Sequence, residues 1–369
     1  MSKSRVREHL LLNKRMLCLK TRAFCRSQIN DYRGLITNAT TSGLVMSVRN
    51  LSTYPERSPT QVSVFDARNL YLNSVLQSSL LSLLHTPEIM GLDFKVFHST
   101  RPSATRTGPS GHDDLKWVPT SSTLIFGDRD AVLVDAQLTE EAAKELVSWV
   151  VAADKNITHI YVTHAHGDHF FGCGLLLETF PNAKVVATSE VVAGMDNELT
   201  PKRREFWNTL FPGKIPKNLV SGSPLHADQL ELEGESLHAL RVGHTDTDDT
   251  TILWVPSIGL AVVGDAVYAN THPYLGEAKS ESSRLEWIAA LDKIAALCPK
   301  AVVGGHSDPS KGYDPQAIEE TKVYLQNFNR LCEETETAEE LYHRLLDLYP
   351  KRINPGSAWA GASLVKKSS

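Results

Sequence analysis

One short run of the sequence contains four side chains that can bind a metal ion. Residues 164–169 read HAHGDH, so three imidazoles and one carboxylate fall within six residues. The run follows the strand-like segment 160–162 and precedes Gly172, where a helix can begin. Imidazole and carboxylate without thiolate suit zinc, manganese or iron. Clustered imidazoles on a loop would repel one another if no cation held them, so the run predicts a metal site.

The spacing within the run suggests two ions. His164 and His166, two residues apart, can reach one ion, whereas Asp168 and His169 point toward a second ion nearby. The remaining ligands must come from distant parts of the chain. Three candidates follow β-rich runs and stand beside glycines, which let the backbone approach a site closely: His244, Asp265 and His306.

Alternating strands and helices must position these residues. Short β-rich runs are expected at 122–126, 131–135, 159–163, 184–187, 237–242, 250–255, 260–264 and 301–304. Helical patterns cover 140–153, 315–332, 338–348 and a segment opened by Ser283 and Glu286, which have capping-box spacing. The fold class is therefore α/β, with a C-terminal helical extension.

The order of these motifs resembles the signature of the metallo-β-lactamase-fold hydrolase superfamily. That signature is a strand-terminal Asp, then His-x-His-x-Asp-His, then His, Asp and His at later strand ends. It is matched here by Asp135, residues 164–169, His244, Asp265 and His306. The resemblance covers about residues 93–310 and implies a four-layer αββα sandwich.

The resemblance also implies a role for each site residue. His164, His166 and His244 would hold a first zinc ion. Asp168, His169 and His306 would hold a second, and Asp265 would bridge the two. Asp135 resembles the family residue that orients the site without touching metal. Manganese or iron in place of zinc is compatible with the same donors.

Two details indicate a branch of the superfamily. Its true β-lactamases use cysteine where Asp265 stands, whereas a bridging Asp together with His169 is the pattern of the glyoxalase II, lactonase and ribonuclease Z branches. Tyr268 follows Asp265 by three residues, which resembles the Asp-x-x-Tyr of N-acyl homoserine lactonases. There the phenol contacts the substrate carbonyl or leaving oxygen. A tyrosine packed in the core is the alternative reading.

The expected activity is that of a dinuclear zinc-dependent hydrolase. It would open a small lactone or lactam, or cleave a related ester or thioester, with a metal-bridging hydroxide. Two cations sharing a water lower its pKa to near 7, so no side-chain base is required. Asp168 would aim the hydroxide, and Tyr268 would donate a hydrogen bond to the oxyanion or leaving group.

Other activities of the same fold remain alternatives. One is a glyoxalase II-like thioesterase, although the basic glutathione-binding residues of those proteins cannot be identified in this sequence. A mitochondrial iron-dependent persulfide dioxygenase would carry an Arg-Gly-Cys-Gly-Arg run that is absent. A ribonuclease Z-like nuclease is disfavoured by charge, and a binding protein with an inactive site is disfavoured because no ligand is missing.

Charge and composition bound the organisation of the chain. The net charge is −5, but residues 1–60 carry +8, which leaves −13 for the rest and argues against a nucleic-acid partner. Residues 1–90 are predicted to be a basic, disordered or targeting extension, with Met90 as an alternative initiator. Residues 91–310 would form the catalytic domain, and 311–369 the C-terminal helices and tail.

No apolar run approaches the roughly 18 residues of a membrane span, so no membrane association is expected. Five scattered cysteines suit a reducing compartment. The expected location is intracellular, either cytoplasmic or, if the basic segment is a transit peptide, mitochondrial.

Two further segments bear on the substrate. The irregular segment 192–219 predicts a lid or an amphipathic helix covering the core, and its apolar residues would also allow a homodimer. A pocket for a small-molecule substrate is expected at Phe206, Trp207 and His272. The acidic turn with Asp246, Asp248 and Asp249 is expected to be solvated, the alternative being contact with water or a polar substrate group at the site.

Overall fold

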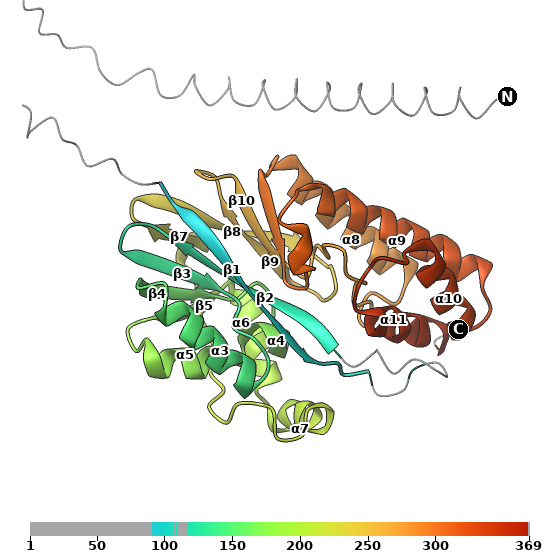
Figure 1. Cartoon of the computed structure of the whole chain (residues 1–369), viewed down its shortest axis with the longest axis horizontal. Coiled ribbons are helices and arrows are strands. Elements are labelled where there is room, and N and C mark those ends of the chain that lie inside the picture. Colours follow the sequence, from blue (N-terminus) through green and yellow to red (C-terminus); the bar gives the residue numbers. More distant parts are fainter. Residues whose placement is uncertain (1–90, 106–107, 109–116, 368–369) are drawn as a thin grey trace, which may run out of the picture. The chain divides into compact units, whose positions relative to one another are not determined.

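The computed structural model describes residues 91–369, apart from 106–107, 109–116 and 368–369. The extension expected at residues 1–90 lies outside these ranges. The described residues belong to one compact unit with two β-sheets and helices on their outer faces (Figure 1). The predicted α/β sandwich with C-terminal helices is confirmed.

The first sheet places two of the expected site segments at one edge. Its strands are ordered β1 (Asp93–Pro102), β2 (Trp117–Phe126), β3 (Asp130–Val134), β4 (Asn156–Tyr161), β5 (Lys184–Ala187) and β6 (Ser223–Pro224). Strands β3, β4 and β5 run parallel, so their carboxyl ends lie side by side. Asp135 follows β3, and the HAHGDH run follows β4 after two residues.

The second sheet supplies the remaining site segments in the same way. Its order is β11 (Ala301–Gly304), β10 (Leu260–Gly264), β9 (Thr250–Val255), β8 (Glu235–Gly243) and β7 (Gln229–Leu232). Strands β10 and β11 are parallel, so Asp265 and His306 emerge at neighbouring strand ends. His244 follows directly after β8.

Alternation along the buried strands explains the four layers. In β3, Leu133 packs with the helices outside the first sheet, while Val132 and Val134 face the second sheet. In β10, Val262 joins the inter-sheet core, and Val263 packs against the helices outside the second sheet. The strands are therefore buried on both faces, as expected for sheets covered by helices.

The helices divide between the two outer faces (Figure 1). The first sheet carries α3 (Glu140–Val151), α4 (Gly167–Phe170), α5 (Cys173–Thr179), α6 (Ser189–Glu198) and α7 (Pro201–Leu210). The second carries α8 (Glu281–Ala296), α9 (Gln316–Glu334), α10 (Ala338–Leu348) and α11 (Pro355–Lys367). Two short 3₁₀ helices, His226–Asp228 and Pro309–Lys311, complete the helical segments of the described part.

Three local details differ from the sequence expectations. The cap of α8 is Ser280, whose Oγ accepts from the backbone N–H of Ser283, so the helix begins before the predicted capping box. Helix α11 was not expected at all. The segment 192–219 contains the end of α6 and all of α7, which makes much of it helical rather than irregular. None of the helices in the described ranges is long and apolar enough to span a membrane.

Candidate metal centre

The loop after β4 is held in place by a buried carboxylate. Asp135 adopts a positive φ of 61° directly after β3, and its Oδ1 accepts from the backbone N–H of Thr163 at 2.9 Å. The Thr163 hydroxyl donates to the same carboxylate. These contacts fix the backbone where the HAHGDH run begins, because a buried carboxylate requires such partners.

Three sets of donor atoms meet at this edge. Within each set, the ligand atoms lie within 4.8 Å of one another. The sets are His164 with His166 and Asp246, His164 with His169 and Asp265, and Asp168 with His169 and His306. Six of the seven predicted ligands are thus brought together, and Asp246 joins them.

Asp265 shares a donor set with His164, a predicted ligand of the first ion, and lies close to two predicted ligands of the second. Its Oδ1 lies 3.3 Å from Nε2 of His169, and its Oδ2 lies 3.1 Å from Nε2 of His306. The side chain is buried, with only 2% of its surface exposed. A carboxylate so placed can contact two ions at once.

The donor atoms fit a metal site because several are buried without hydrogen bonds. Buried polar groups are normally hydrogen-bonded, so unsatisfied ones require an explanation. Among the described residues, the buried side-chain atoms without a hydrogen-bond partner include five at this site: His164 Nε2, His169 Nε2, His244 Nε2, Asp246 Oδ2 and Asp265 Oδ1. Cations held by these atoms would satisfy them.

The outer nitrogens of two histidines already have partners. Nδ1–H of His169 donates to Asp135 Oδ2 at 2.8 Å, and Nδ1–H of His306 donates to the Pro119 carbonyl. Each contact leaves Nε2 facing the cluster. Histidine ligands of metals are oriented by such second contacts.

Charge also favours cations at this place. Burial lowers the pKa of His164 to about 4, which keeps this imidazole neutral and able to ligate. Burial opposes the charged form of His306 too, but Asp265 and Asp168 reverse the effect and raise its pKa to about 9. Without metal, the buried carboxylates thus keep a proton on a neighbouring imidazole. Bound metal ions would supply the positive charge in place of that proton.

Arg101, at the end of β1, was missed by the sequence analysis. Its guanidinium donates to Asp168 Oδ2 at 2.6 Å, and only 11% of its side chain is exposed. Burial alone would raise the pKa of Asp168, but Arg101, His169 and His306 hold it well below its usual range. No motif marks an arginine 67 positions before its partner.

The expectation of a solvated acidic turn is wrong for Asp246. This residue has 0% exposure, whereas 85% of the Asp248 side chain is exposed and Asp249 is exposed as well. Asp246 Oδ2 lies 3.0 Å from His166 Nδ1 and 3.6 Å from His164 Nε2. A turn of three acids gives no sequence signal as to which one faces inward.

His244 is the predicted ligand that joins none of the three sets. Its Nδ1–H donates to Asp248 Oδ1 at 2.6 Å, and its buried Nε2 has no hydrogen-bond partner. The ring is therefore oriented by a carboxylate, as metal-binding histidines are, without lying within 4.8 Å of two other grouped donors.

Glu277 is a further site contact without a motif. Its Oε1 lies 3.1 Å from Nε2 of His166, and its Oε2 accepts from the Thr247 hydroxyl at 2.6 Å. Burial would raise its pKa, but the hydrogen bond from His166 lowers it to about 2. His166 therefore lies between two carboxylates, one buried and one half-exposed.

Tyr268 lies at the site but faces Asp265. Its hydroxyl donates to Asp265 Oδ2 at 2.6 Å, and its ring stacks on His306 with centroids 5.7 Å apart. Only 1% of the residue is exposed. Burial raises the pKa of this phenol, so it remains a hydrogen-bond donor.

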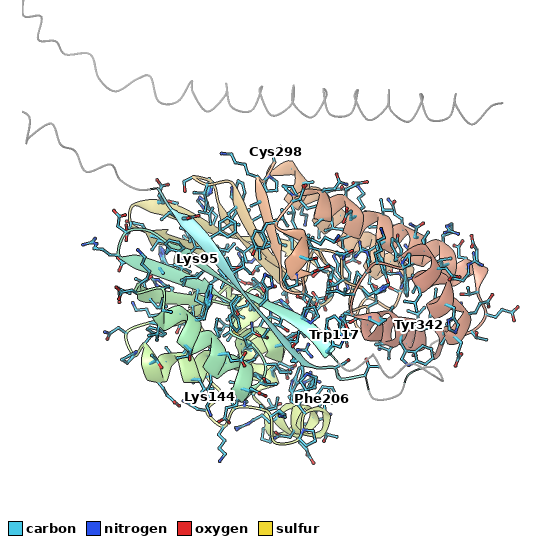
Figure 2. All side chains as sticks on the ribbon, in the orientation of Figure 1. Lys95, Trp117, Lys144, Phe206, Cys298 and Tyr342 are labelled. Atoms are coloured by element: carbon cyan, nitrogen blue, oxygen red, sulfur yellow. The ribbon has the colours of Figure 1, made fainter. Side chains whose placement is uncertain are left out.

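The three expected pocket residues lie in three different surroundings. Trp207 belongs to the core beneath α7, where it stacks on Phe211. Phe206 is 44% exposed on α7 at the edge of the molecule (Figure 2). His272 is buried, and its Nδ1 shares a hydrogen bond with the hydroxyl of Tyr324.

Gly305 lets the two sheets close around the cluster. A Cβ atom at this position would lie 2.3 Å from Asp265 Oδ1 and 2.6 Å from Cε1 of His169. Such distances are far below van der Waals contact. Glycine is required here because no room is left for a side chain, and not because of the backbone conformation.

Comparisons with known proteins agree with this geometry. The family model described as "Metallo-beta-lactamase superfamily" matches residues 115–306. The chain is similar to the uncharacterized protein YobT of Bacillus subtilis strain 168, with 28% identity over 203 residues, covering 51% of this chain and 83% of that protein. It is 23% identical over 218 residues to metallo-beta-lactamase type 2 of Bacteroides fragilis, covering 57% and 77%.

A solved structure has a similar fold. It is a metallo-beta-lactamase family protein from Thermus thermophilus, with a TM-score of 0.50 and 23% identity, covering 72% of this chain and 91% of that one. At this identity the likeness concerns the fold alone. The matched family model covers all the strands after β1 and every predicted ligand, and the chain therefore belongs to the metallo-β-lactamase superfamily.

Proposed function

We propose that the protein is a dinuclear zinc hydrolase that opens small lactones or lactams, or cleaves related esters or thioesters. The observation that carries the proposal is the position of Asp265, which shares a donor set with His164 on the side of the first ion and lies against His169 and His306 on the side of the second. A carboxylate between two groups of buried donors is what a shared pair of cations requires. Superfamily members are typically metal-dependent hydrolases, which supports the same reaction class.

Bound metal ions would supply two effects, a lowered pKa for a shared water and polarisation of the substrate carbonyl. The chain's own residues would direct this chemistry. Asp168 accepts a hydrogen bond from the attacking water and aims it, while Arg101 keeps this carboxylate ionised. Ionised Asp168 can only accept, so it fixes the orientation of the water.

Tyr268 is the proposed donor to the substrate. Its phenol remains protonated, and its hydroxyl lies 2.6 Å from Asp265 Oδ2, at the centre of the cluster. Turning from Asp265 to the carbonyl or leaving oxygen would place a hydrogen bond where negative charge develops. A ring-opening reaction benefits because the leaving alkoxide stays attached to the product and must be protonated there.

A direct assay tests this proposal. The full-length protein is offered a panel of lactones, lactams, acyclic esters and thioesters, including a glutathione thioester, alongside Asp265→Asn. We expect ring opening by the wild type and a loss of at least about 100-fold in the variant. Asp347→Asn, an exposed residue on α10, is the matched control and should keep its activity. Absence of hydrolysis across the panel would overturn the proposal.

One observation favours a second function. Two histidines and one carboxylate are also the set that non-haem iron oxygenases use, and His164, His166 and Asp246 form such a set. An iron-dependent persulfide dioxygenase is therefore the alternative. Oxygen uptake with a glutathione persulfide, together with one iron per chain and no ester hydrolysis, would replace the hydrolase by the dioxygenase.

A further inference from the structure

We infer that Asp246 is a direct metal ligand, which coordinates the same ion as His164 and His166. The inference rests on the proposed metal centre and adds a ligand from the acidic turn after β8. It concerns which atoms bind the ion rather than which substrate is cleaved.

The position of the Asp246 carboxylate is the first argument. Its Oδ2 lies 3.0 Å from Nδ1 of His166 and 3.6 Å from Nε2 of His164, and these three atoms form one of the donor sets. The residue is fully buried, and Oδ2 has no partner with hydrogen-bond geometry. Its other oxygen, Oδ1, accepts from the Thr245 hydroxyl at 2.9 Å, which leaves Oδ2 directed at the two imidazoles.

The surroundings of His166 are the second argument. Nδ1 faces Asp246, whereas Nε2 faces Glu277 at 3.1 Å. If a metal takes Nδ1, then Nε2–H donates to Glu277, and this outer carboxylate fixes the tautomer as in other metal sites. An Asp246 that instead accepted a hydrogen bond from Nδ1–H of His166 would leave Nε2, which faces Glu277, as the only ring nitrogen for the ion.

Charge balance is the third argument. Neutral imidazoles bring no charge, so the negative charge that balances an ion at His164 and His166 must come from carboxylates. Asp168 belongs to the set with His169 and His306, whereas Asp265 belongs to the set with His164 and His169 and would be shared between the two ions. Asp246 is the buried acid in the set around His164 and His166, so it lowers the charge of this side of the centre.

The competing ligand from the same turn is less well placed. His244 belongs to none of the donor sets, although its Nε2 is buried. The family resemblance gives His244 this position, whereas the donor set around His164 and His166 contains Asp246. The two residues are close enough in sequence to serve the same ion, so the inference adds Asp246 to the ligands without removing His244.

The test compares zinc affinity between matched variants of the full-length protein. Metal-free wild type, Asp246→Asn and Asp249→Asn are titrated with zinc in competition with a chelating indicator. Asp249 is the control because it lies in the same turn, is exposed, and has a positive φ of 56° that asparagine tolerates. We expect Asp246→Asn to lower the affinity for one zinc ion by more than about 100-fold, which exceeds the loss caused by removing an outer contact. The zinc affinity of Asp249→Asn should be unchanged.

A second measurement uses the wild type and so does not depend on the variant folding. Long-range ¹H–¹⁵N spectra of the zinc-loaded protein report which His166 nitrogen carries the proton, with the signal assigned by its loss in His166→Gln. A proton on Nε2 places the ion on Nδ1, the nitrogen beside Asp246, as the inference requires. A proton on Nδ1, or Asp246→Asn affinity within tenfold of the wild type, would overturn it. Neither readout depends on whether any substrate is hydrolysed.

Discussion

Single residues at the centre carry charges that only close partners stabilise. Asp168 is 5% exposed and contacts the guanidinium of Arg101. Removing one partner of a buried pair leaves an uncompensated charge, which is costly in a folded protein. A metal ion near Asp168 would also compensate the negative charge of this carboxylate. The carboxylate would therefore depend less on Arg101 when metal is bound.

Arg101→Gln should therefore destabilise the metal-free protein more than the zinc-loaded one. We expect a loss of about 3 kcal/mol in the free energy of unfolding without metal, and a clearly smaller loss with zinc. Arg330→Gln removes an exposed pair with Glu334 and should cost less than about 1 kcal/mol in both states. Urea unfolding with and without zinc measures this, and equal losses in both states would contradict it.

The sequence identifies residues that belong to a dense motif better than residues that act alone. His164, His166 and His169 stand out because three imidazoles within six positions rarely arise by chance. Arg101 and Glu277 reach the site from a strand end and a loop with no motif around them. Asp246 lies in an acidic turn whose inward-facing member depends on the backbone rather than on residue type.

The helices of segment 192–219 act mainly as a cover for the first sheet's outer core. Trp207 stacks on Phe211 and packs edge-on against Phe171, while its indole N–H donates to Glu198 Oε2 at 2.6 Å. Glu198 is itself buried. Of the two predicted roles, a helix covering the core is the one these contacts support.

Trp207→Phe tests this role because phenylalanine keeps an aromatic ring but cannot donate a hydrogen bond. We expect a loss of about 1–3 kcal/mol in the free energy of unfolding, since Glu198 Oε2 is left without this donor. Phe206→Leu on the exposed side of α7 should change it by less than about 0.5 kcal/mol. Chemical denaturation measures both. If Phe206→Leu proved the more destabilising, the assignment of α7 as a core cover would be wrong.

The junction between the loop after β10 and α9 contains a buried neutral histidine. Burial, together with the charge of Arg352, lowers the pKa of His272 from its usual 6.5 to about 3. Between pH 6.5 and about pH 3, His272 therefore binds a proton in the unfolded chain but stays neutral in the folded chain. Stability from this group is complete above pH 6.5 and is lost as the pH falls toward 3.

His272→Gln should flatten this acid dependence. The decrease in unfolding free energy between pH 7 and pH 4 should be smaller in the variant by roughly 3 kcal/mol, at about 1.4 kcal/mol per pKa unit. Metal-free samples exclude the contribution of metal release. His226→Gln, at an exposed position, is the control and should follow the wild type. A variant with the same pH dependence as the wild type would contradict the buried neutral state.

At the level of elements, strong patterns were predictable and weak ones were not. β10 reads as a continuous apolar run and is buried at every position, so its prediction required no tertiary information. The two residues of β6 form a strand only because β5 lies beside them. Helix α11 contains glycine and serine at several positions, so its helical state depends on packing of residues such as Ala358 and Ala362.

At the scale of the whole molecule, the C-terminal helices share a core with the second sheet. Tyr324, Phe328 and Leu341 belong to the same buried cluster as Val263 and Trp287. The Arg352 guanidinium donates to the carbonyls of Tyr268 and Thr271, which links the C-terminal segment to the loop beside the metal centre. The domain boundary expected at residue 310 passes through this core.

Removal of residues 311–369 should therefore prevent folding. Each large side chain lost from the cluster contributes roughly 1.5–3 kcal/mol through burial, and several are lost together. We expect no cooperative thermal transition and no near-ultraviolet circular dichroism from a chain that ends at residue 310. A truncated protein that unfolds cooperatively and binds zinc would contradict this view of the C-terminal helices.

The number of zinc ions bound per chain is the most direct measure of the proposed dinuclear centre. The full-length protein, loaded with zinc and freed of excess, is weighed by native mass spectrometry beside Asp265→Asn and the exposed control Asp347→Asn. We expect two zinc ions per chain in the wild type and the control, and loss of at least one in Asp265→Asn. A wild-type chain without bound metal, or an Asp265→Asn variant that retains both ions, would contradict it.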